Sequence, residues 1–571
     1  MKAQMGRYRK SADKADDRVL VPKSTGGEVS VVLAHPSTYA VGMSSLGYQV
    51  VWDIFNSIPG VWVERAFAGD MRNKPPRSFE SGRHASDFDI VAFSLSYEPD
   101  AVNMVRFLAK SGIPTETRKR HAKDPVIVVG GIVPTLNPEP YSDFVDLFIL
   151  GEAEEALPEL MERLVEFRGA SRTRLLAEAT RVEGVYAPKL YDVKYGPGIA
   201  NIDRAPRRPE APEKIRRRLT SDIDRRSARS VFYAPASNFG DMGLLEIARG
   251  CARGCRFCAA GHIMRPPRFR SVKSLAKDMD FLKGNFDRIG LVASTATDHP
   301  KLKTILEMAK ARELTVSFAS LPAESITGEI IEATGGEIKT LTIAPETGTE
   351  KLRRVVNKNV SNEEIIDAAF IAAEAGIKRI KMYFLVGLPG ENGDDVAAIG
   401  ELTRLVAEST RRAKKNVEIV ASVAPFVPKA HTPFGLHPME NAKVIDSRLA
   451  EVAGFVRKIP GATVRREPVA EAVFQALLSR GDRRAGAFIK KALAEGGSMK
   501  RAIRDLPKWA VDTLYAQRTI DQPTPWSFID DRIGNRYIIS EYHQGLLGRI
   551  SKPCKPSRCA ICDACGNIRK P

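Results

Sequence analysis

Two successive series of alternating strand-like and helix-like segments constrain the fold of this 571-residue chain more than any other feature. Near-continuous apolar strands that are separated by helices predict a parallel sheet covered on both faces. We therefore expect a doubly wound, Rossmann-like domain at 29–190, in which ligands bind at the carboxyl ends of the strands. Its expected strands are 28–35, 62–69, 89–97, 125–132 and 147–153.

A second series of six strand–helix units predicts a partial (βα)6 barrel of the TIM type at 241–445. In such barrels the chemistry lies at the C-terminal ends of the strands. Residues 446–550 show mainly amphipathic helical patterns, and 551–571 form a cysteine-rich tail. A polar segment, 1–28, precedes both domains. The expected barrel strands are 244–250, 288–294, 315–321, 340–346, 379–389 and 416–426.

The formal net charge of +18 raises the question of an anionic partner such as a nucleic acid. The basic residues are densest at 204–229, which holds ten basic and four acidic residues. This segment has no aromatic residues to stack on bases, so we interpret 191–240 as a solvated basic linker between domains. The N-terminus lacks a secretory pattern and no run of apolar residues is long enough to span a membrane, so we expect a cytoplasmic protein.

The seven cysteines fall into two tight clusters and occur nowhere else. Disulfides would require an export signal and more scattered partners. Tight spacing in a reducing compartment indicates a metal or iron–sulfur site instead. The clusters are Cys251, Cys255 and Cys258, and then Cys554, Cys559, Cys562 and Cys565.

The first cluster has the spacing C-x3-C-x2-C and directly follows the first expected barrel strand. Three thiolates on one loop can hold three irons of a 4Fe–4S cluster and leave the fourth iron with an open position. A zinc site is the alternative, but zinc prefers four ligands, and the nearest further candidate is His262.

The segment RGCARGCRFCAAG, 249–261, resembles the radical S-adenosylmethionine (SAM) superfamily, and the segments 344–358, 382–392 and 422–434 resemble the ends of its later barrel strands. The resemblance implies that SAM binds the open iron and that an electron from the cluster cleaves SAM to a 5′-deoxyadenosyl radical. The residues that it places around SAM are Phe257 and Gly387 with Pro389 near the adenine, Glu346 near the ribose or methionine, and Ser294 with Thr295 at the second strand. At that second strand the chain departs from the family pattern. Glu346 has the alternative role of a helix cap, and Gly387 with Pro389 that of an ordinary turn.

Residues 129–154 resemble the cobalamin-binding domain that is fused to many radical SAM enzymes. The Asp-x-His-x-x-Gly motif that supplies a lower cobalt ligand is missing, because His35 lacks its Asp and Gly neighbours. The alternative is a doubly wound domain that binds a nucleotide or nothing, since a fold does not imply a ligand. The resemblance implies that the corrin faces Gly130, Gly131, Pro134, Thr135, Gly151 and Glu152, with Ser94 and Ser96 at the same end of the sheet.

The second cluster, C-x4-C-x2-C-x2-C, supplies four thiolates, which suit a closed site with a second 4Fe–4S cluster or structural zinc. The region before it resembles the C-terminal part of a cobalamin-associated radical SAM branch with a cysteine-rich tail.

These resemblances together imply a radical SAM enzyme with cobalamin-dependent methylation of an unactivated carbon in an unidentified substrate, supplied with electrons by a flavodoxin or ferredoxin. One alternative is a radical SAM enzyme without cobalamin that performs rearrangement, oxidation or methylthiolation of a substrate such as RNA. The N-terminal domain contains no cysteine, which argues against the methylthiotransferase branch. A non-enzymatic iron–sulfur scaffold that binds nucleic acid is a further alternative.

Overall fold

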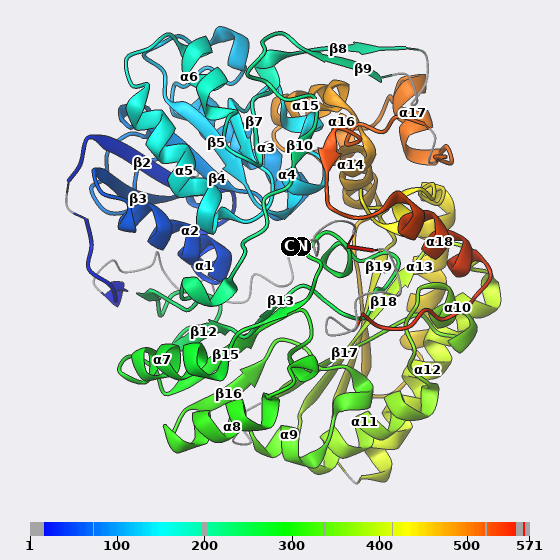
Figure 1. Ribbon diagram of the computed structural model, residues 1–571. Coiled ribbons are helices and arrows are strands. Elements are labelled where there is room, and N and C mark those ends of the chain that lie inside the picture. Colours follow the sequence, from blue (N-terminus) through cyan, green and yellow to red (C-terminus); the bar gives the residue numbers. More distant parts are fainter. Residues whose placement is uncertain are drawn as a thin grey trace.

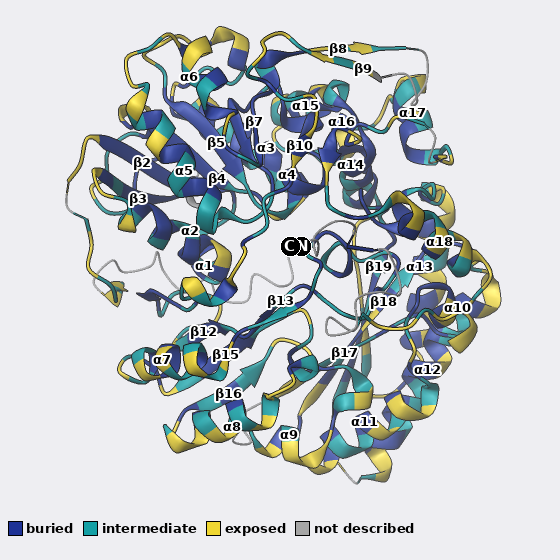
Figure 2. Ribbon diagram, viewed as in Figure 1, coloured by how far each residue is buried: buried dark blue, intermediate teal, exposed yellow. Residues whose placement is uncertain are grey.

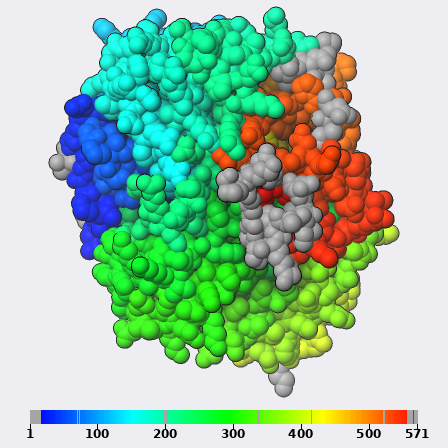
Figure 3. Space-filling model, in the orientation of Figure 1, coloured from blue at the N-terminus to red at the C-terminus, as the bar shows by residue number. Residues whose placement is uncertain are grey.

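The computed structural model describes residues 16–24, 26–71, 74–196, 202–334, 339–413, 415–519, 522–554 and 564–565. Figure 1 shows two α/β bodies, an N-terminal one in blue and cyan and a second one in green and yellow. The orange and red C-terminal segments run beside both bodies, and the space-filling view shows them packed against each (Figure 3). No helix in the described part of the chain has the length and apolar character that a membrane span requires.

The N-terminal body contains a six-stranded sheet in the order β3-β2-β4-β5-β6-β7. Its first five strands are parallel and only β7 is antiparallel. Every residue of β2 is buried, as expected for a strand with helices on both faces. This confirms the doubly wound domain. The strands are β2 (Val29–His35), β3 (Val61–Phe67), β4 (Ile90–Ser94), β5 (Val126–Gly130), β6 (Leu147–Ile149) and β7 (Val185–Tyr186).

Helices cover both faces of this sheet, and the strands form the dark core in Figure 2. The chain passes from β2 to β3 on one side and then crosses back to β4 on the other side of β2, which places the topological switch point between β2 and β4. Ligands of doubly wound domains bind beside the carboxyl ends of strands at such a point. The helices are α1 (Tyr39–Met43), α2 (Leu46–Ser57), α3 (Ala101–Lys110), α4 (Ile132–Leu136), α5 (Ala153–Glu166) and α6 (Arg172–Ala179).

The basic segment between the domains is folded, which corrects its interpretation as a solvated linker. Arg217 is only 2% exposed, and Arg218 forms ion pairs with Glu155 and Glu159 of α5. Acidic residues of the protein itself therefore neutralise part of the charge that suggested an anionic partner. Its strands are β8 (Tyr191–Tyr195), β9 (Ile202–Pro206), β10 (Ile215–Arg216), which pairs with β21 (Ile529–Asp530), and β11 (Phe232–Tyr233), which pairs with β1 (Arg18–Val19).

Within the described residues, the second body contains seven parallel strands in two sheets, β12-β15-β16 and β17-β18-β19-β20. All six predicted barrel strands are present, which confirms the partial barrel. The sheet also continues past 445, because β20 pairs in parallel with β19. The strands are β12 (Met242–Glu246), β15 (Arg288–Val292), β16 (Thr315–Phe318), β17 (Thr340–Glu346), β18 (Arg379–Val386), β19 (Glu418–Pro425) and β20 (Ala462–Arg466).

Helices follow the barrel strands on the outside, and their exposed faces are yellow in Figure 2. Local signals start several of them. Ser361 and Asn392, for example, form capping boxes at the start of α11 and α12. The helices are α7 (Val272–Lys283), α8 (Leu302–Ala311), α9 (Gly328–Glu332), α10 (Glu350–Val355), α11 (Asn362–Glu374), α12 (Gly393–Arg412) and α13 (Ala442–Val456).

The C-terminal extension is mainly helical, as predicted, and it joins the two bodies. Asn137 of the N-terminal domain donates hydrogen bonds to the carbonyls of Ser479 and Gly481, at the end of α14. On the barrel side, Glu541 of α18 pairs with Arg256. The helices are α14 (Val469–Arg480), α15 (Gly486–Ala494), α16 (Met499–Ala502), α17 (Lys508–Tyr515) and α18 (Asn535–Leu546).

Candidate active site

The three-cysteine motif lies on a loop that begins where the first barrel strand ends. A short antiparallel pair, β13 (Ala248–Arg249) and β14 (Arg268–Phe269), closes this loop, which we call the cysteine loop (250–267). Gly250 begins it with a φ of 82°, and a Cβ there would lie 2.4 Å from the carbonyl oxygen of Met264. Only glycine fits such a conformation and such a close approach.

Cys251, Cys255 and Cys258 are all half-buried on the cysteine loop. Burial raises the pKa of the Cys255 thiol to about 12; Lys358 opposes this rise, and the neighbouring Cys258 and Cys251 add to it. No group of three His, Cys, Asp or Glu side chains within the described ranges is close enough to hold a single metal ion. In a 4Fe–4S cluster each cysteine binds a different iron. The donor set of three thiols on one loop fits that cluster.

Polar contacts tie the cysteine loop to the ends of the neighbouring barrel strands. Cys251 Sγ lies 3.8 Å from Thr295 Oγ1, just after β15. Arg253 pairs with Asp298 at 2.8 Å and with Glu324, which follow β15 and β16. The loop thus spans the carboxyl ends of the strands, where a TIM-type barrel holds its reactants.

Arg256, although it lies between two of the cysteines, anchors the loop instead of facing a cluster. Its guanidinium is 0% exposed and donates to the carbonyls of Arg354 and Val355 at 2.9 Å each. These carbonyls lie at the C-terminal end of α10, where a cation is favourable. Glu541, 3.1 Å away, completes its pairing.

Phe257 is partly buried in an apolar cluster that includes Leu388, Phe426 and Phe434. This contact joins the cysteine loop to the segments after β18 and β19. Gly387 and Pro389, predicted to lie near the adenine, flank Leu388 and are buried. The N–H of Gly387 donates to Glu391 Oε1 at 2.9 Å, so this segment is also a stabilised turn.

Glu346 ends β17 with a φ of 67°, unusual for a residue other than glycine. Its Oε1 lies 3.2 Å from Lys358 Nζ. Burial raises the pKa of Glu346, and Lys358 opposes that rise. The helix-cap alternative is wrong, because Thr349 caps α10 by accepting the N–H of Leu352. Ser294 is exposed beside Thr295.

At the N-terminal sheet, the predicted residues after β4 and β5 lie at the carboxyl edge. Ser94 is half-buried, and Ser96 is exposed. Gly130 and Gly131 follow at the end of β5, and both are half-buried. A Cβ at Gly130 would meet no atom closer than 3.9 Å, whereas a Cβ at Gly131 would lie 2.4 Å from the Leu95 carbonyl oxygen. A Cβ would therefore fit at Gly130 in ordinary van der Waals contact with Ile149, but not at Gly131.

The loops around β6 are arranged differently from the prediction, and we correct it for Thr135, Gly151 and Glu152. The Thr135 hydroxyl donates to the Gly131 carbonyl and accepts the N–H of Gly151 at 3.0 Å. A Cβ at Gly151 would lie 2.1 Å from the Arg218 carbonyl oxygen, so the folded basic segment covers this end. Glu152 is held by arginines of the barrel. Pro134 is buried in α4.

A histidine–aspartate pair that the sequence analysis missed lies at the end of the sixth strand segment. His431 Nδ1 lies 2.6 Å from Asp531 Oδ2. The other ring nitrogen, Nε2, is buried and has no hydrogen-bond partner among the residues that the structure describes. His431 has a φ of 58°, so its placement is constrained by its surroundings. The histidine stands in the quoted segment SVAPFVPKAHTPF, but its partner is a hundred residues further along the chain.

One described end of the cysteine-rich tail contacts the cysteine loop, and the other contacts the start of α18. The N–H of Cys554 donates to the carbonyl of Ala252 at 2.7 Å. Cys565 is 5% exposed, and the carbonyl of the preceding Ala564 accepts the N–H of Gly534 at the start of α18. Cys559 and Cys562 lie outside the described residues.

A barrel whose mouth carries three half-buried thiols on one loop defines a cluster-binding metalloenzyme. Two family models match this chain: residues 47–188 match the N-terminal domain of radical SAM proteins, and residues 245–403 match the radical SAM superfamily. The chain therefore belongs to the radical SAM superfamily and is an enzyme of that class. Membership implies a 4Fe–4S cluster and SAM as cofactors.

The chain is also similar to individual proteins. An uncharacterised protein of Methanocaldococcus jannaschii is 26% identical over 460 residues, which are 79% of this chain and 89% of that protein. The ribosomal protein uS12 methylthiotransferase RimO of Thermotoga maritima is 25% identical over 221 residues, 36% of this chain and 47% of the enzyme. Among solved structures, the cobalamin-dependent SAM radical enzyme OxsB has a TM-score of 0.46 and 15% identity, over 86% of this chain and 64% of that one.

Proposed function

We propose that this radical SAM enzyme methylates an unactivated carbon of its substrate and uses cobalamin as the methyl carrier. When bound, the cluster supplies the electron that cleaves SAM and so provides the radical that removes a hydrogen atom from the substrate. Cobalamin, when bound, supplies the methyl group. The contribution of the chain is to hold these groups in place and to exclude water.

The observation that carries this proposal is that the carboxyl edge of the N-terminal sheet faces the mouth of the barrel. Glu98, just after β4, pairs with Lys429 of the loop after β19. Its other carboxylate oxygen accepts a hydrogen bond from Gln475 of α14 at 2.8 Å. Both kinds of domain bind ligands at these edges. A carrier on one edge and a radical on the other would reach the same substrate.

The residues of the N-terminal edge fit a corrin in part. The ends of β4 and β5 offer Ser94, Ser96, Gly130 and Gly131, all of them half-buried or exposed. The end of β6 does not fit, because the basic segment and the barrel arginines already contact it. Cobalamin would therefore lie over the carboxyl ends of β4 and β5, beside the topological switch point between β2 and β4.

His431 supplies a polar group for the substrate. A buried ring nitrogen without a partner costs free energy, on the order of 1–3 kcal/mol, unless a ligand satisfies it. Its position after β19 places it at the carboxyl end of the barrel. Asp531 fixes the orientation of the ring, as carboxylates do for functional histidines.

The tail would hold a second metal site. Four thiolates suit a closed site of zinc or of a second 4Fe–4S cluster. The contact of Cys554 with Ala252 supports a position beside the catalytic loop. An electron donor such as a flavodoxin or ferredoxin would reduce the catalytic cluster.

Methylthiolation is the competing reaction, since RimO is among the relatives. Methylthiotransferases carry a second cluster on N-terminal cysteines, and the N-terminal domain here contains none. A radical SAM enzyme without cobalamin is the remaining alternative.

The test is the metal and corrin content of protein purified without oxygen from cells that are supplied with cobalamin. Stoichiometric cobalt together with iron is expected. Gly130→Leu should project a large side chain from the carboxyl end of β5 and abolish cobalt retention, while iron content and SAM cleavage persist. Gly328→Leu, at an exposed glycine with no atom within 4 Å, is the matched control.

Protein that contains iron but no cobalt would leave radical chemistry in place and remove the methylation proposal. Cobalt retention by Gly130→Leu equal to that of the unaltered enzyme would show that the corrin does not lie over β5.

A further inference from the structure

Two arginines face each other at the base of the cysteine loop, in the strand pair β13 and β14 that we call the neck. Arg249 of β13 is paired in register with Arg268 of β14, so they are direct cross-strand neighbours. Cys251, Cys255 and Cys258, which we call the cysteine triad, all lie in the loop that this strand pair closes. Like charges directly opposite each other in an antiparallel pair destabilise it. The neck therefore needs a counter-charge to stay closed.

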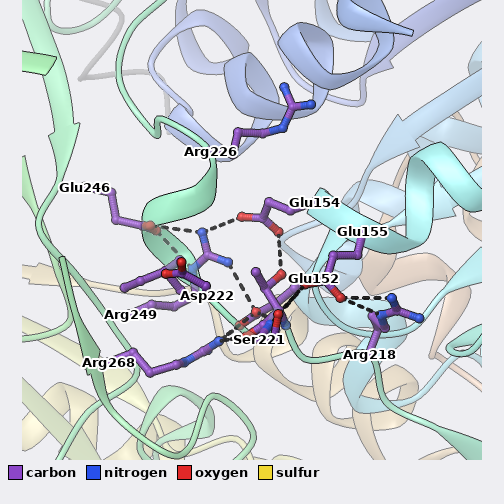
Figure 4. A network of polar contacts seen from close by, with 12 residues as sticks. Glu152, Glu154, Glu155, Arg218, Ser221, Asp222, Arg226, Glu246, Arg249 and Arg268 are labelled. Carbon is purple, nitrogen blue, oxygen red and sulfur yellow. Dashed lines mark hydrogen bonds and ion pairs between the residues drawn. The ribbon is translucent and has the colours of Figure 1, made fainter. Parts of the chain in front are cut away.

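Glu152 of the N-terminal domain supplies that counter-charge (Figure 4). Its Oε2 lies 2.9 Å from Arg268 Nη1 and 3.4 Å from Arg249 Nη1. The same carboxylate accepts the N–H of Thr220 at 2.8 Å. One carboxylate thus contacts both strands of the neck and the basic segment.

The environment keeps Glu152 ionised. Its side chain is 9% exposed, and burial alone would raise its pKa. The hydrogen bond from Arg268 and the charges of Arg249 and Arg268 outweigh burial and lower the pKa to about 2. Glu152 also precedes α5, where the helix N-terminus favours a negative charge.

Two further carboxylates complete the charge balance around Arg249. Glu154 of α5 lies 2.7 Å from it, and Glu246 at the end of β12 lies 2.9 Å from it. Glu246 also pairs with Arg270, just after the neck. Among the carboxylates that the structure describes, however, only Glu152 contacts both Arg249 and Arg268.

We propose that Glu152 is a positioning residue that holds the neck of the cysteine loop, so that docking of the N-terminal domain sets the geometry of the cluster site. Removal of its charge leaves two adjacent arginines without their shared partner. The neck then opens and the three thiols lose their fixed spacing. This inference rests on the radical SAM assignment and is independent of cobalamin.

The test compares Glu152→Gln with Glu155→Gln by hydrogen exchange of the 250–267 peptides in protein without cluster. Glu155 is the matched control, since it lies in the first turn of α5 and pairs with Arg218 and Ser221, away from the neck. We expect exchange in 250–267 to rise roughly tenfold or more in Glu152→Gln, since a buried charge loses its partner. Glu155→Gln should exchange like the unaltered protein.

A second readout uses reconstituted protein. The electron paramagnetic resonance signal of the reduced cluster, with and without SAM, should change in Glu152→Gln and not in Glu155→Gln. Because Glu152→Gln alone could fail to fold, Glu152→Gln with Arg268→Gln is the second variant. This double variant removes the charge excess and should return exchange in 250–267 toward that of the unaltered protein.

Three outcomes would overturn the inference. They are unaltered exchange and spectra in Glu152→Gln, equal effects of both single variants, and a double variant that is more open than Glu152→Gln. Equal effects would mean that the acidic residues hold the domains together without any particular action on the cysteine loop.

Discussion

Asp531 Oδ2 lies 2.6 Å from His431 Nδ1, and this contact joins the loop after the sixth barrel strand to the C-terminal extension. Burial would raise the pKa of Asp531, but the charge of His431 and its hydrogen bond lower it. The pair thus holds a carboxylate and a ring in fixed orientation at the carboxyl end of the barrel, and Nε2 has no hydrogen-bond partner among the described residues.

We expect His431 and Asp531 to be strongly coupled in their contributions to the free energy of unfolding. His431→Asn keeps a residue type that tolerates the positive φ but leaves Asp531 without its partner, and we expect a loss of about 3 kcal/mol in the free energy of unfolding. His431→Asn with Asp531→Asn should lose less than the sum of the single variants, by about 1–3 kcal/mol. Denaturant unfolding measures this cycle, with His121→Asn at an exposed histidine as the control. Additive losses would contradict the coupling.

It should be possible to remove the metal site of the cysteine triad and the metal site of the tail independently of each other. Cys255→Ala removes one of three cluster ligands, and we expect it to abolish formation of 5′-deoxyadenosine from SAM while the tail keeps its metal. Replacement of Cys559 and Cys562 together should remove the tail metal and retain the triad iron. Metal analysis and product chromatography measure both. Normal 5′-deoxyadenosine formation by Cys255→Ala would refute the assignment of the triad.

The fold was largely predictable, because apolar periodicity reports which faces of an element are buried. The predicted strands at 28–35 and 340–346 became β2 and β17, and the cysteine loop lies after the first barrel strand as expected. The strand β20 was missed, because its sequence, ATVRR, has few apolar residues at the edge of the barrel sheet.

The partners of charged residues were not predictable in the same way. Glu152 follows a glycine in a loop that resembles a corrin-facing one, and nothing near it in the sequence identifies Arg249 and Arg268 as its partners. We likewise interpreted the basic segment as solvated from its sequence, because the carboxylates that bind Arg218 lie more than fifty residues before it in the chain. Such pairings depend on how distant elements pack, which local patterns do not encode.

The start of the cysteine loop should tolerate only glycine. Gly250→Ala places a Cβ against the Met264 carbonyl at a positive φ, a conformation that costs about 1–2 kcal/mol before the clash is counted. We expect the variant to fold but to lose most of its triad iron. Gly284→Ala is the matched control, with an ordinary φ of −67° and its nearest atom at 3.6 Å. Full triad iron in Gly250→Ala would contradict the tight turn.

Acid should weaken the contact between the N-terminal domain and the C-terminal extension through Glu139. Its Oε1 accepts hydrogen bonds from Tyr186 at 2.6 Å and from Arg204 at 2.9 Å, and Arg483 of the extension lies 3.3 Å from Oε2. Burial alone would raise the pKa of Glu139, but the charges of Arg483 and Arg204 and the hydrogen bonds lower it from 4.5 to about 2.

Because the folded pKa is depressed, the stabilisation by Glu139 is present above pH 4.5 and is lost as the pH falls from 4.5 toward 2. The shift corresponds to about 3 kcal/mol at neutral pH. Glu139→Gln should therefore be less stable than the unaltered protein at pH 7, and this difference should shrink below pH 4.5. Denaturant unfolding between pH 7 and pH 3 measures it, with the exposed Glu166→Gln as the control. A constant difference across that range would show that Glu139 acts through its shape and not through its charge.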